Sequence, residues 1–310
     1  MVVQSTRSSR AQSRDVKARR LTAAMVATLL MSGCAAAPEP APMPAAPANP
    51  PAGMQYLYGS GEAAALSIQA WHALVDYVTE NRGGNPEEGV VLEKGATLAA
   101  PGFVRCGDKP PAVVFDVDET VLLNLGYEYQ DAKSGQPYDQ ARWERWEQTG
   151  AGKVAPAPGA VEGVAALRKA GVTVVFNSNR AAANAAWTAD AIRRAGLGPA
   201  IHGATLFLAG DDAGGTRKDG RRATIAARYC VIAMAGDQLG DFSDLFAAIP
   251  GAASRRAAAM AGPVAKLWGH GWFVLPNPVY GSGLKGGFDD IFPQDKRWTD
   301  PAQPADQGAK

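Results

Sequence analysis

The sequence predicts an α/β fold, an open, doubly wound parallel sheet with helices on both faces. Three short apolar runs rich in β-branched residues indicate buried strands, at residues 111–116, 172–176 and 230–235. Helical patterns precede the second and third runs, at residues 163–170 and 221–228. Because polar residues end or follow each apolar run, we expect a ligand site at the carboxyl ends of the strands.

Two further segments frame these strands. Apolar residues recur at near-helical spacing from residue 63 to residue 81, which predicts a helix before the first strand. An insertion rich in Tyr, Trp and charged residues spans residues 124–158, directly after the first strand. It is either a lid over the site or a long surface excursion, and its aromatic residues favour the lid.

The amino-terminal residues 1–33 are typical of a bacterial signal peptide. Six basic residues and one acidic residue precede an apolar run at residues 21–31, which is too short to span a bilayer. The run ends in Met31-Ser32-Gly33-Cys34, which resembles a lipobox, so we expect Cys34 to be lipidated; the alternative is an ordinary signal peptide with a chance cysteine. This predicts an exported protein anchored to a bacterial membrane, most simply the outer membrane, facing the periplasm or the cell surface.

The rest of the chain divides by composition. Ala and Pro dominate the start of residues 34–58, which we expect to form a semi-rigid tether. One domain is expected at residues 59–300, followed by a flexible tail at residues 301–310. The net charge of +1, from 31 basic and 30 acidic residues, gives no reason to expect a nucleic acid polymer as partner. Composition leaves the oligomeric state open.

Two cysteines remain inside the expected domain, Cys106 and Cys230. Each precedes a strand that ends in a carboxylate, and the two strands should be neighbours, so a disulfide between them is one hypothesis and two free thiols the other.

The strand ends carry residues suited to phosphoryl chemistry. Asp116 and Asp118 lie two residues apart, so one carboxylate can attack phosphorus while the other moves a proton. A hydroxyl, an ammonium group and two further carboxylates follow along the chain and offer donors for phosphate oxygens and oxygen ligands for a hard cation. They are Ser178, Lys218, Asp237 and Asp241.

These motifs, in this order, resemble the four motifs of the haloacid dehalogenase (HAD) superfamily: Asp-x-Asp-x-Thr, a Ser after the second strand, a Lys, and Gly-Asp-x-x-x-Asp. The chain is more closely similar to the class C acid phosphatases, also called the lipoprotein e(P4) 5'-nucleotidase family. That similarity rests on Phe115 to Leu122, Ser178-Asn179-Arg180, Gly236 to Phe242, Leu275-Pro276-Asn277 and Tyr280-Gly281. It implies a Rossmann-like HAD sheet with a small, mainly helical cap.

The resemblance also implies a role for each carboxylate. Asp116 would be the nucleophile and a Mg²⁺ ligand, and Asp118 the acid/base, whose backbone carbonyl also binds the metal. Asp237 would be the second carboxylate ligand, and Asp241 would support the metal directly or through water. The alternative for Asp241 is that it is only the N-cap of a helix that starts at Phe242.

Further residues would contact the substrate. Phosphate-binding roles fall on Ser178, Asn179 and Lys218. The resemblance implies that Tyr127 and Tyr280 sandwich the substrate's ring, with Trp143 and Trp146 adding to the wall. The alternative is that Tyr280 packs at the edge of the core and that Trp143 and Trp146 form the buried stripe of a helix. The family pattern is broken at Leu123, at Leu125-Gly126 and after Gly281, which leaves substrate specificity open.

The predicted function is therefore hydrolysis of small phosphomonoesters, nucleoside 5'-monophosphates included, by a magnesium-dependent acid phosphatase with an aspartyl-phosphate intermediate. A broad acid phosphatase without nucleotide preference, or a phosphotransferase, would use the same catalytic residues, so both stay open as alternatives. The alternative from another class is a non-catalytic surface lipoprotein that binds a ligand or partner on a HAD scaffold. The chain has no Arg-His-Gly, no Cys followed six residues later by Arg, and no Gly-x-Ser-x-Gly, which disfavours the corresponding rival hydrolase mechanisms.

Overall fold

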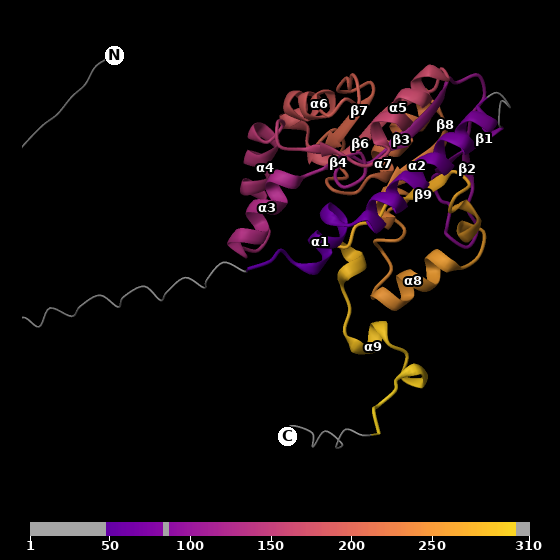
Figure 1. Ribbon diagram of the computed structural model, residues 1–310. Helices are drawn as coiled ribbons and strands as arrows, with labels where there is room; N and C mark the ends of the chain where they lie inside the picture. Colours follow the sequence, from indigo (N-terminus) through magenta and orange to yellow (C-terminus); the bar gives the residue numbers. More distant parts are fainter. Residues whose placement is uncertain (1–47, 83–86, 302–310) are drawn as a thin grey trace, which may run out of the picture. The chain divides into compact units, whose positions relative to one another are not determined.

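A five-stranded parallel sheet forms the centre of the structure, a computed structural model that describes residues 48–82 and 87–301 (Figure 1). The strand order is β7-β6-β3-β8-β9, and every neighbouring pair is parallel. The bounds are β3 Pro111–Phe115, β6 Thr173–Ala181, β7 Leu206–Ala209, β8 Cys230–Gly236 and β9 Trp272–Val274. The predicted α/β class with a parallel sheet is confirmed.

The sheet is doubly wound because its central strands are apolar on both faces. In β3, Val113 and Phe115 belong to one buried cluster, whereas Ala112 and Val114 belong to the other. The first cluster is completed by α2 (Gly61–Asn81), α5 (Ala160–Lys169) and α6 (Ala185–Arg194), the second by α7 (Asp219–Arg228) and a hairpin of β1 (Glu88–Leu92) and β2 (Phe103–Arg105).

Helices α2 and α5 lie side by side on one face of the sheet (Figure 1). The Trp71 ring of α2 stacks on Phe115, with ring centroids 4.9 Å apart. A Cβ at Gly163 of α5 would lie 2.3 Å from the Trp71 ring, so only glycine permits this close approach. The packing fixes β3, and with it the residues that follow its carboxyl end.

One predicted strand is longer in the structure, and two strands of the sheet were not predicted. Strand β6 continues to Ala181 instead of ending at residue 176, because β7 pairs with it as far as Ala181, with an irregularity after Asn177. Strands β7 and β9, with four and three residues, were not predicted because such short runs carry no periodic signal.

The predicted tether ends earlier than residue 58. Helix α1 spans Ala52–Gly59, and its Met54 and Leu57 side chains are buried. The larger apolar side chains after Gly53 can pack against the core, whereas the Ala/Pro-rich part before Gly53 has few such side chains. The folded domain therefore begins by residue 52.

The insertion after β3 contains two short strands and two helices. Strands β4 (Leu122–Leu123) and β5 (Ala155–Pro156) pair antiparallel and bring the two ends of the insertion together. Between them lie α3 (Leu125–Ser134) and α4 (Gln140–Thr149). The carboxy-terminal part adds α8 (Ala252–Met260), α9 (Phe288–Ile291) and 3-10 turns at Ala182–Asn184, Leu239–Asp241, Val264–Leu267, Ser282–Leu284 and Gln294–Lys296.

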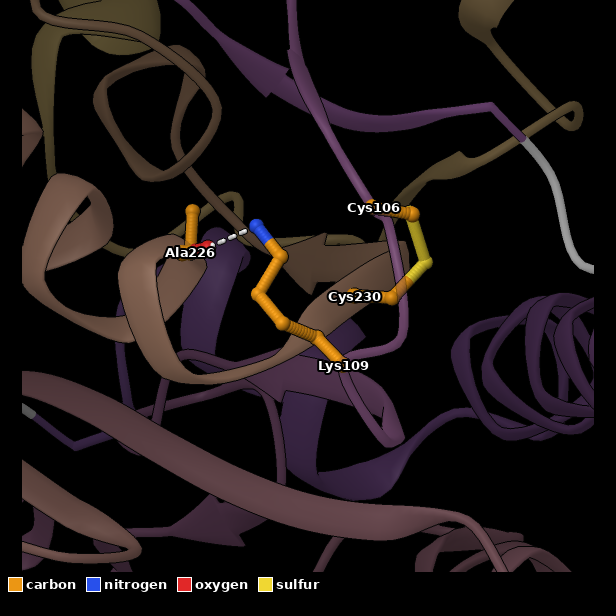
Figure 2. The surroundings of a disulfide bond; sticks show 4 residues. All are labelled: Cys106, Lys109, Ala226 and Cys230. Carbon is orange, nitrogen blue, oxygen red and sulfur yellow. Dashed lines mark hydrogen bonds between the residues drawn. A yellow bond between two sulfur atoms is a disulfide. The ribbon is translucent and has the colours of Figure 1, made fainter.

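Cys106 and Cys230 form a disulfide, which settles the question that the sequence left open (Figure 2). Cys106 follows β2 and Cys230 begins β8, and their Cα atoms are 4.6 Å apart. Nearby, Lys109 Nζ donates a hydrogen bond to the carbonyl of Ala226 at 2.7 Å. The disulfide joins the β1–β2 hairpin to the amino end of the sheet, opposite the end where Asp116 lies.

Within residues 48–82 and 87–301, no helix combines the length and the apolar character that crossing a bilayer requires. The predicted signal peptide, the lipidation site Cys34, the start of the tether and all but the first residue of the predicted tail lie outside the described residues.

Candidate active site

Three carboxylates meet at the carboxyl end of the sheet. Asp116 follows β3, Asp237 follows β8, and Asp241 ends the 3-10 turn Leu239–Asp241. One side-chain oxygen of each lies within 4.8 Å of the others. The approach depends on Gly236, where an added Cβ would stand 2.3 Å from the Asp241 Cβ. An all-oxygen cluster of this kind suits a hard divalent cation.

Asp241 belongs to the carboxylate cluster, and the alternative that it is the N-cap of a helix starting at Phe242 is wrong, because no helix of the described residues starts there. Its Oδ2 accepts from the backbone N of Gln238 at 2.8 Å and so caps the short turn, while its Oδ1 accepts from Lys218 Nζ at 2.6 Å.

Lys218 lies at the start of α7 and is only 4% exposed. Its ammonium group donates to Asp116 as well as to Asp241. Burial disfavours the charged ammonium, but the two carboxylates outweigh this effect and raise the pKa of Lys218. The side chain therefore presents a fixed positive charge beside Asp116.

One lysine does not balance the negative charge of the cluster. Burial, and after it the carboxylate of Asp241, raise the pKa of Asp237 to about 7, although Asn277 and Gln238 donate hydrogen bonds to its carboxylate at 2.6 and 2.9 Å. Burial likewise raises the pKa of Asp116 well above its ordinary value, against the opposing effect of Lys218. Excess negative charge on buried oxygens is what a bound cation relieves, so these residues fit a metal site.

Asp118 is held differently from the cluster. Oδ1 accepts from Arg180 Nε at 2.9 Å, from Arg180 Nη2 at 2.7 Å and from Asn124 Nδ2 at 2.9 Å. Burial alone would raise the pKa of Asp118, but the charge and hydrogen bonds of Arg180 outweigh it and hold the pKa below its ordinary value of 3.8. Because Arg180 is 1% exposed, water screens this pair little.

Glu119 connects the catalytic turn to three other segments. It is the one non-glycine residue of the described part with a positive φ, 54°, and it is buried. Its carboxyl group accepts hydrogen bonds from the hydroxyls of Tyr58 in α1 and Tyr280 near the carboxyl terminus, and from the backbone N of Asn124 at 2.9 Å. A strained backbone fixed by side chains from distant segments is typical of a functional turn.

A cavity of about 610 Å³ opens over these groups. Its wall includes the carboxylates of the cluster, Asp118, Lys218 and Asn179, and its rim is aromatic. The aromatic side chains are Tyr127, Tyr138, Trp143 and Tyr280. Tyr127 packs edge-on against Trp143 with ring centroids 4.9 Å apart, so cap helices α3 and α4 build one wall together.

Two predicted site residues do not line the cavity. Ser178 is fully buried, and its Oγ donates to Asp118 Oδ2 at 3.2 Å, so it lies beside the predicted acid/base instead of at the cavity wall. Trp146 packs inside the cap, where a Cβ on Gly150 would lie 2.2 Å from its ring, and its Nε1 donates to Asn124 Oδ1 at 3.1 Å. Trp146 is a packing residue because it points toward Gly126 and Gly150.

Several residues that sequence reasoning missed support a predicted one. Arg180 and Asn124 hold Asp118, Asn277 holds Asp237, and Glu119 holds Tyr280. A signal existed for Arg180: two residues after Ser178 in a strand, it projects from the same face and toward the same carboxylate.

The site thus combines a buried carboxylate beside an ammonium group, a second carboxylate two residues away, and an oxygen cluster that fits a divalent cation. Such an arrangement can transfer a phosphoryl group through a covalent carboxyl intermediate.

Comparisons with known proteins agree with this chemistry. Residues 64–283 match the family described as HAD superfamily, subfamily IIIB (acid phosphatase). Among solved structures, the class C acid phosphatase of Bacillus anthracis is similar with a TM-score of 0.60 and 22% sequence identity, covering 74% of this chain and 84% of that one. The structure of the same bacterial enzyme with tungstate bound gives the same values. At this identity the structural likeness supports the fold.

Proposed function

Because this chain belongs to the subfamily IIIB acid phosphatases of the HAD superfamily, we propose that it hydrolyses small phosphomonoesters, nucleoside 5'-monophosphates among them, with Mg²⁺ and through a phosphoryl group on Asp116. The observation that carries the proposal is the placement of Asp116 in the cavity wall, bonded to Lys218 and two residues from Asp118.

In the first half of the reaction, an oxygen of Asp116 attacks phosphorus. The bond between phosphorus and the leaving oxygen breaks, and its electron pair stays with that oxygen. Asp118 supplies the proton that makes the leaving group a neutral alcohol. Arg180 then stabilises the carboxylate left on Asp118 through two charge-assisted hydrogen bonds.

In the second half, water attacks the phosphorus of the aspartyl-phosphate while Asp118 takes a proton from it. The bond from phosphorus to Asp116 breaks, and inorganic phosphate and the original carboxylate are released. Lys218 and Asn179, which line the cavity, are placed to contact phosphoryl oxygens. Ser178 joins them only if its hydroxyl leaves Asp118.

Asp116, Asp237 and Asp241 fit as carboxylate ligands of Mg²⁺, with the backbone carbonyl of Asp118 as the resemblance implies. Bound there, the ion supplies positive charge against the phosphoryl oxygens. The aromatic rim supports a planar leaving group, because a ring that enters the cavity meets Tyr127, Trp143 and Tyr280.

We also propose that the protein is exported and anchored through Cys34; the disulfide supports the export, since such bonds persist in oxidising compartments. Full-length protein is expected in the membrane fraction and a Cys34→Ser variant in the soluble fraction. Equal partition of the two proteins would contradict the anchor.

The experiment that tests the catalytic proposal measures phosphate release from adenosine 5'-monophosphate and from p-nitrophenyl phosphate, with Mg²⁺ or with EDTA. We expect wild type to need the metal and Asp116→Asn to be inactive. Tungstate, bound by the structural neighbour, serves as a phosphate-like inhibitor. A wild-type protein that is inactive on both substrates from acid to neutral pH would favour a non-catalytic binding scaffold.

A further inference from the structure

Glu128 is a buried carboxyl group that the proposed reaction does not use. It follows Tyr127 on α3 and is 5% exposed. It lines the cavity over the active site and also a second cavity of about 430 Å³, whose wall includes Tyr58 of α1 and Tyr129 of α3. Met54 lines both cavities too, so Glu128 and Met54 form the wall that the two cavities share.

The Glu128 carboxyl group has no hydrogen-bond donor within residues 48–82 and 87–301. Two other buried glutamates, Glu119 and Glu147, do have donors. Glu119 accepts from two tyrosine hydroxyls and from Asn124, and Glu147 accepts from Asn184 Nδ2 at 2.6 Å and from the backbone N of Ala181. The oxygens of the Glu128 carboxyl group can therefore form hydrogen bonds with a molecule in the cavity.

The surroundings of Glu128 favour its neutral form. Burial, and after it the nearby carboxylates of Glu119 and Asp131, raise the pKa of its carboxyl group to about 8. Arg142 opposes this shift, but its guanidinium group is bonded to Asp131 at 2.5 Å. A neutral carboxyl group offers one O–H donor and one carbonyl acceptor, side by side.

We propose that Glu128 is a specificity-determining residue that hydrogen-bonds the leaving group of the substrate and favours planar heterocycles with an adjacent donor and acceptor on one edge. The inference rests on the proposed function and adds to it a residue that selects among the proposed substrates. The natural nucleobases all carry such an edge, whereas a phenyl ring carries none. Glu128 thus selects nucleoside monophosphates over aryl phosphates without choosing strongly among the bases.

The position of Glu128 beside the aromatic wall supports this role. Tyr127, the preceding residue, and Trp143 form the ring-binding wall of the same cavity. A ring held against that wall brings its edge, not its face, to side chains that surround the wall. Reading a base by stacking and by hydrogen bonds to its edge is a common way to recognise nucleobases.

The test compares Glu128→Leu and Glu128→Gln with wild type. The measured quantity is kcat/KM for adenosine 5'-monophosphate divided by kcat/KM for p-nitrophenyl phosphate, with Mg²⁺ present. Leucine removes both hydrogen-bonding groups, and the expected fall in this ratio is about fivefold to tenfold, the worth of one neutral hydrogen bond. Glutamine keeps a donor and an acceptor at the same place, and we expect its ratio to stay within about twofold of wild type.

Two controls separate folding and the parent proposal from this inference. Thermal unfolding establishes that each variant is folded, and Glu80→Gln removes an exposed carboxyl group at the far end of α2. A folded Glu128→Leu protein with an unchanged ratio overturns the inference, as it would if water alone satisfied Glu128. A Glu128→Gln protein that behaves like Glu128→Leu also overturns it. Failure of the proposed function is a different result, because wild type would then hydrolyse neither substrate.

Discussion

Replacing Arg180 with methionine should move the pH dependence of catalysis, because Arg180 controls how readily Asp118 holds a proton. The guanidinium group makes two hydrogen bonds to the same oxygen of Asp118, at 2.9 and 2.7 Å, from a site that is 1% exposed. An arginine in direct contact lowers the pKa of an aspartate by about 1–3 units, and one unit is worth about 1.4 kcal/mol.

The direction of the effect follows from the role of Asp118 as an acid. Asp118 must be protonated to protonate the leaving oxygen, so activity should fall as the pH rises through its pKa. Arg180 holds that pKa low and therefore places the falling limb in the acid range. In Arg180→Met the pKa rises, and the falling limb should move to higher pH by about 1–3 units.

The assay is kcat/KM for adenosine 5'-monophosphate between about pH 3.5 and pH 8, because its poor leaving group depends most on the proton. Ionisation of the substrate is the same for both proteins and cancels in the comparison. Arg180→Lys, which keeps the charge, is the matched variant and should shift the limb less. Breaking a buried ion pair costs about 3–5 kcal/mol of stability, so unfolding curves must show that the variants are folded. A folded Arg180→Met enzyme with the wild-type limb would refute this account of Asp118.

Four further outcomes are expected. A Cys106→Ser/Cys230→Ser protein should lose roughly 5 kcal/mol of stability in urea unfolding, the entropy of a loop closed over 124 residues, and an unchanged midpoint would contradict this. Glu128→Gln should gain stability relative to wild type as the pH rises from about 4.5 to about 8, with no further gain above that range. The reason is that the wild-type glutamate ionises in the unfolded chain at lower pH than in the folded protein, which destabilises the folded wild-type protein over this range. A stability difference that does not change with pH would exclude the raised pKa. Trp146→Ala should lower stability by about 3 kcal/mol, whereas Trp143→Ala should chiefly raise KM for the nucleotide, and the reverse pattern would mean that the two tryptophans have exchanged roles. Removal of divalent ions with EDTA should stop phosphate release and lower the unfolding temperature, both restored by Mg²⁺; full activity in EDTA would contradict the metal site.

The sequence was informative wherever a residue's chemistry is tied to a strand end. The apolar runs that begin β3, β6 and β8 were predictable because a strand buried on both faces is mostly apolar, and that placed Asp116 and Asp237 at the same edge. Lys218 was found from the motif order, although only folding brings it to Asp116, 102 residues away in sequence.

Residues that act through another side chain were harder to predict. Arg180, Asn277 and Glu119 carry no chemistry of their own in the proposed reaction, and their partners come from other segments of the chain. The aromatic residues of the insertion show the same limit. Helical spacing places Trp143 and Trp146 on neighbouring positions of α4, but the glycines on either side of Trp146 decide which ring fills the cap.

The central claim, a phosphoryl group carried by Asp116, is tested most directly by acid quench during turnover followed by mass spectrometry of the peptide that contains Asp116 and Asp118. The account predicts a phosphoryl group on Asp116 in the wild-type enzyme and none in Asp116→Asn, which should also release no phosphate. A wild-type enzyme that turns over without a phosphorylated peptide, together with an Asp116→Asn protein that keeps its activity, would contradict it.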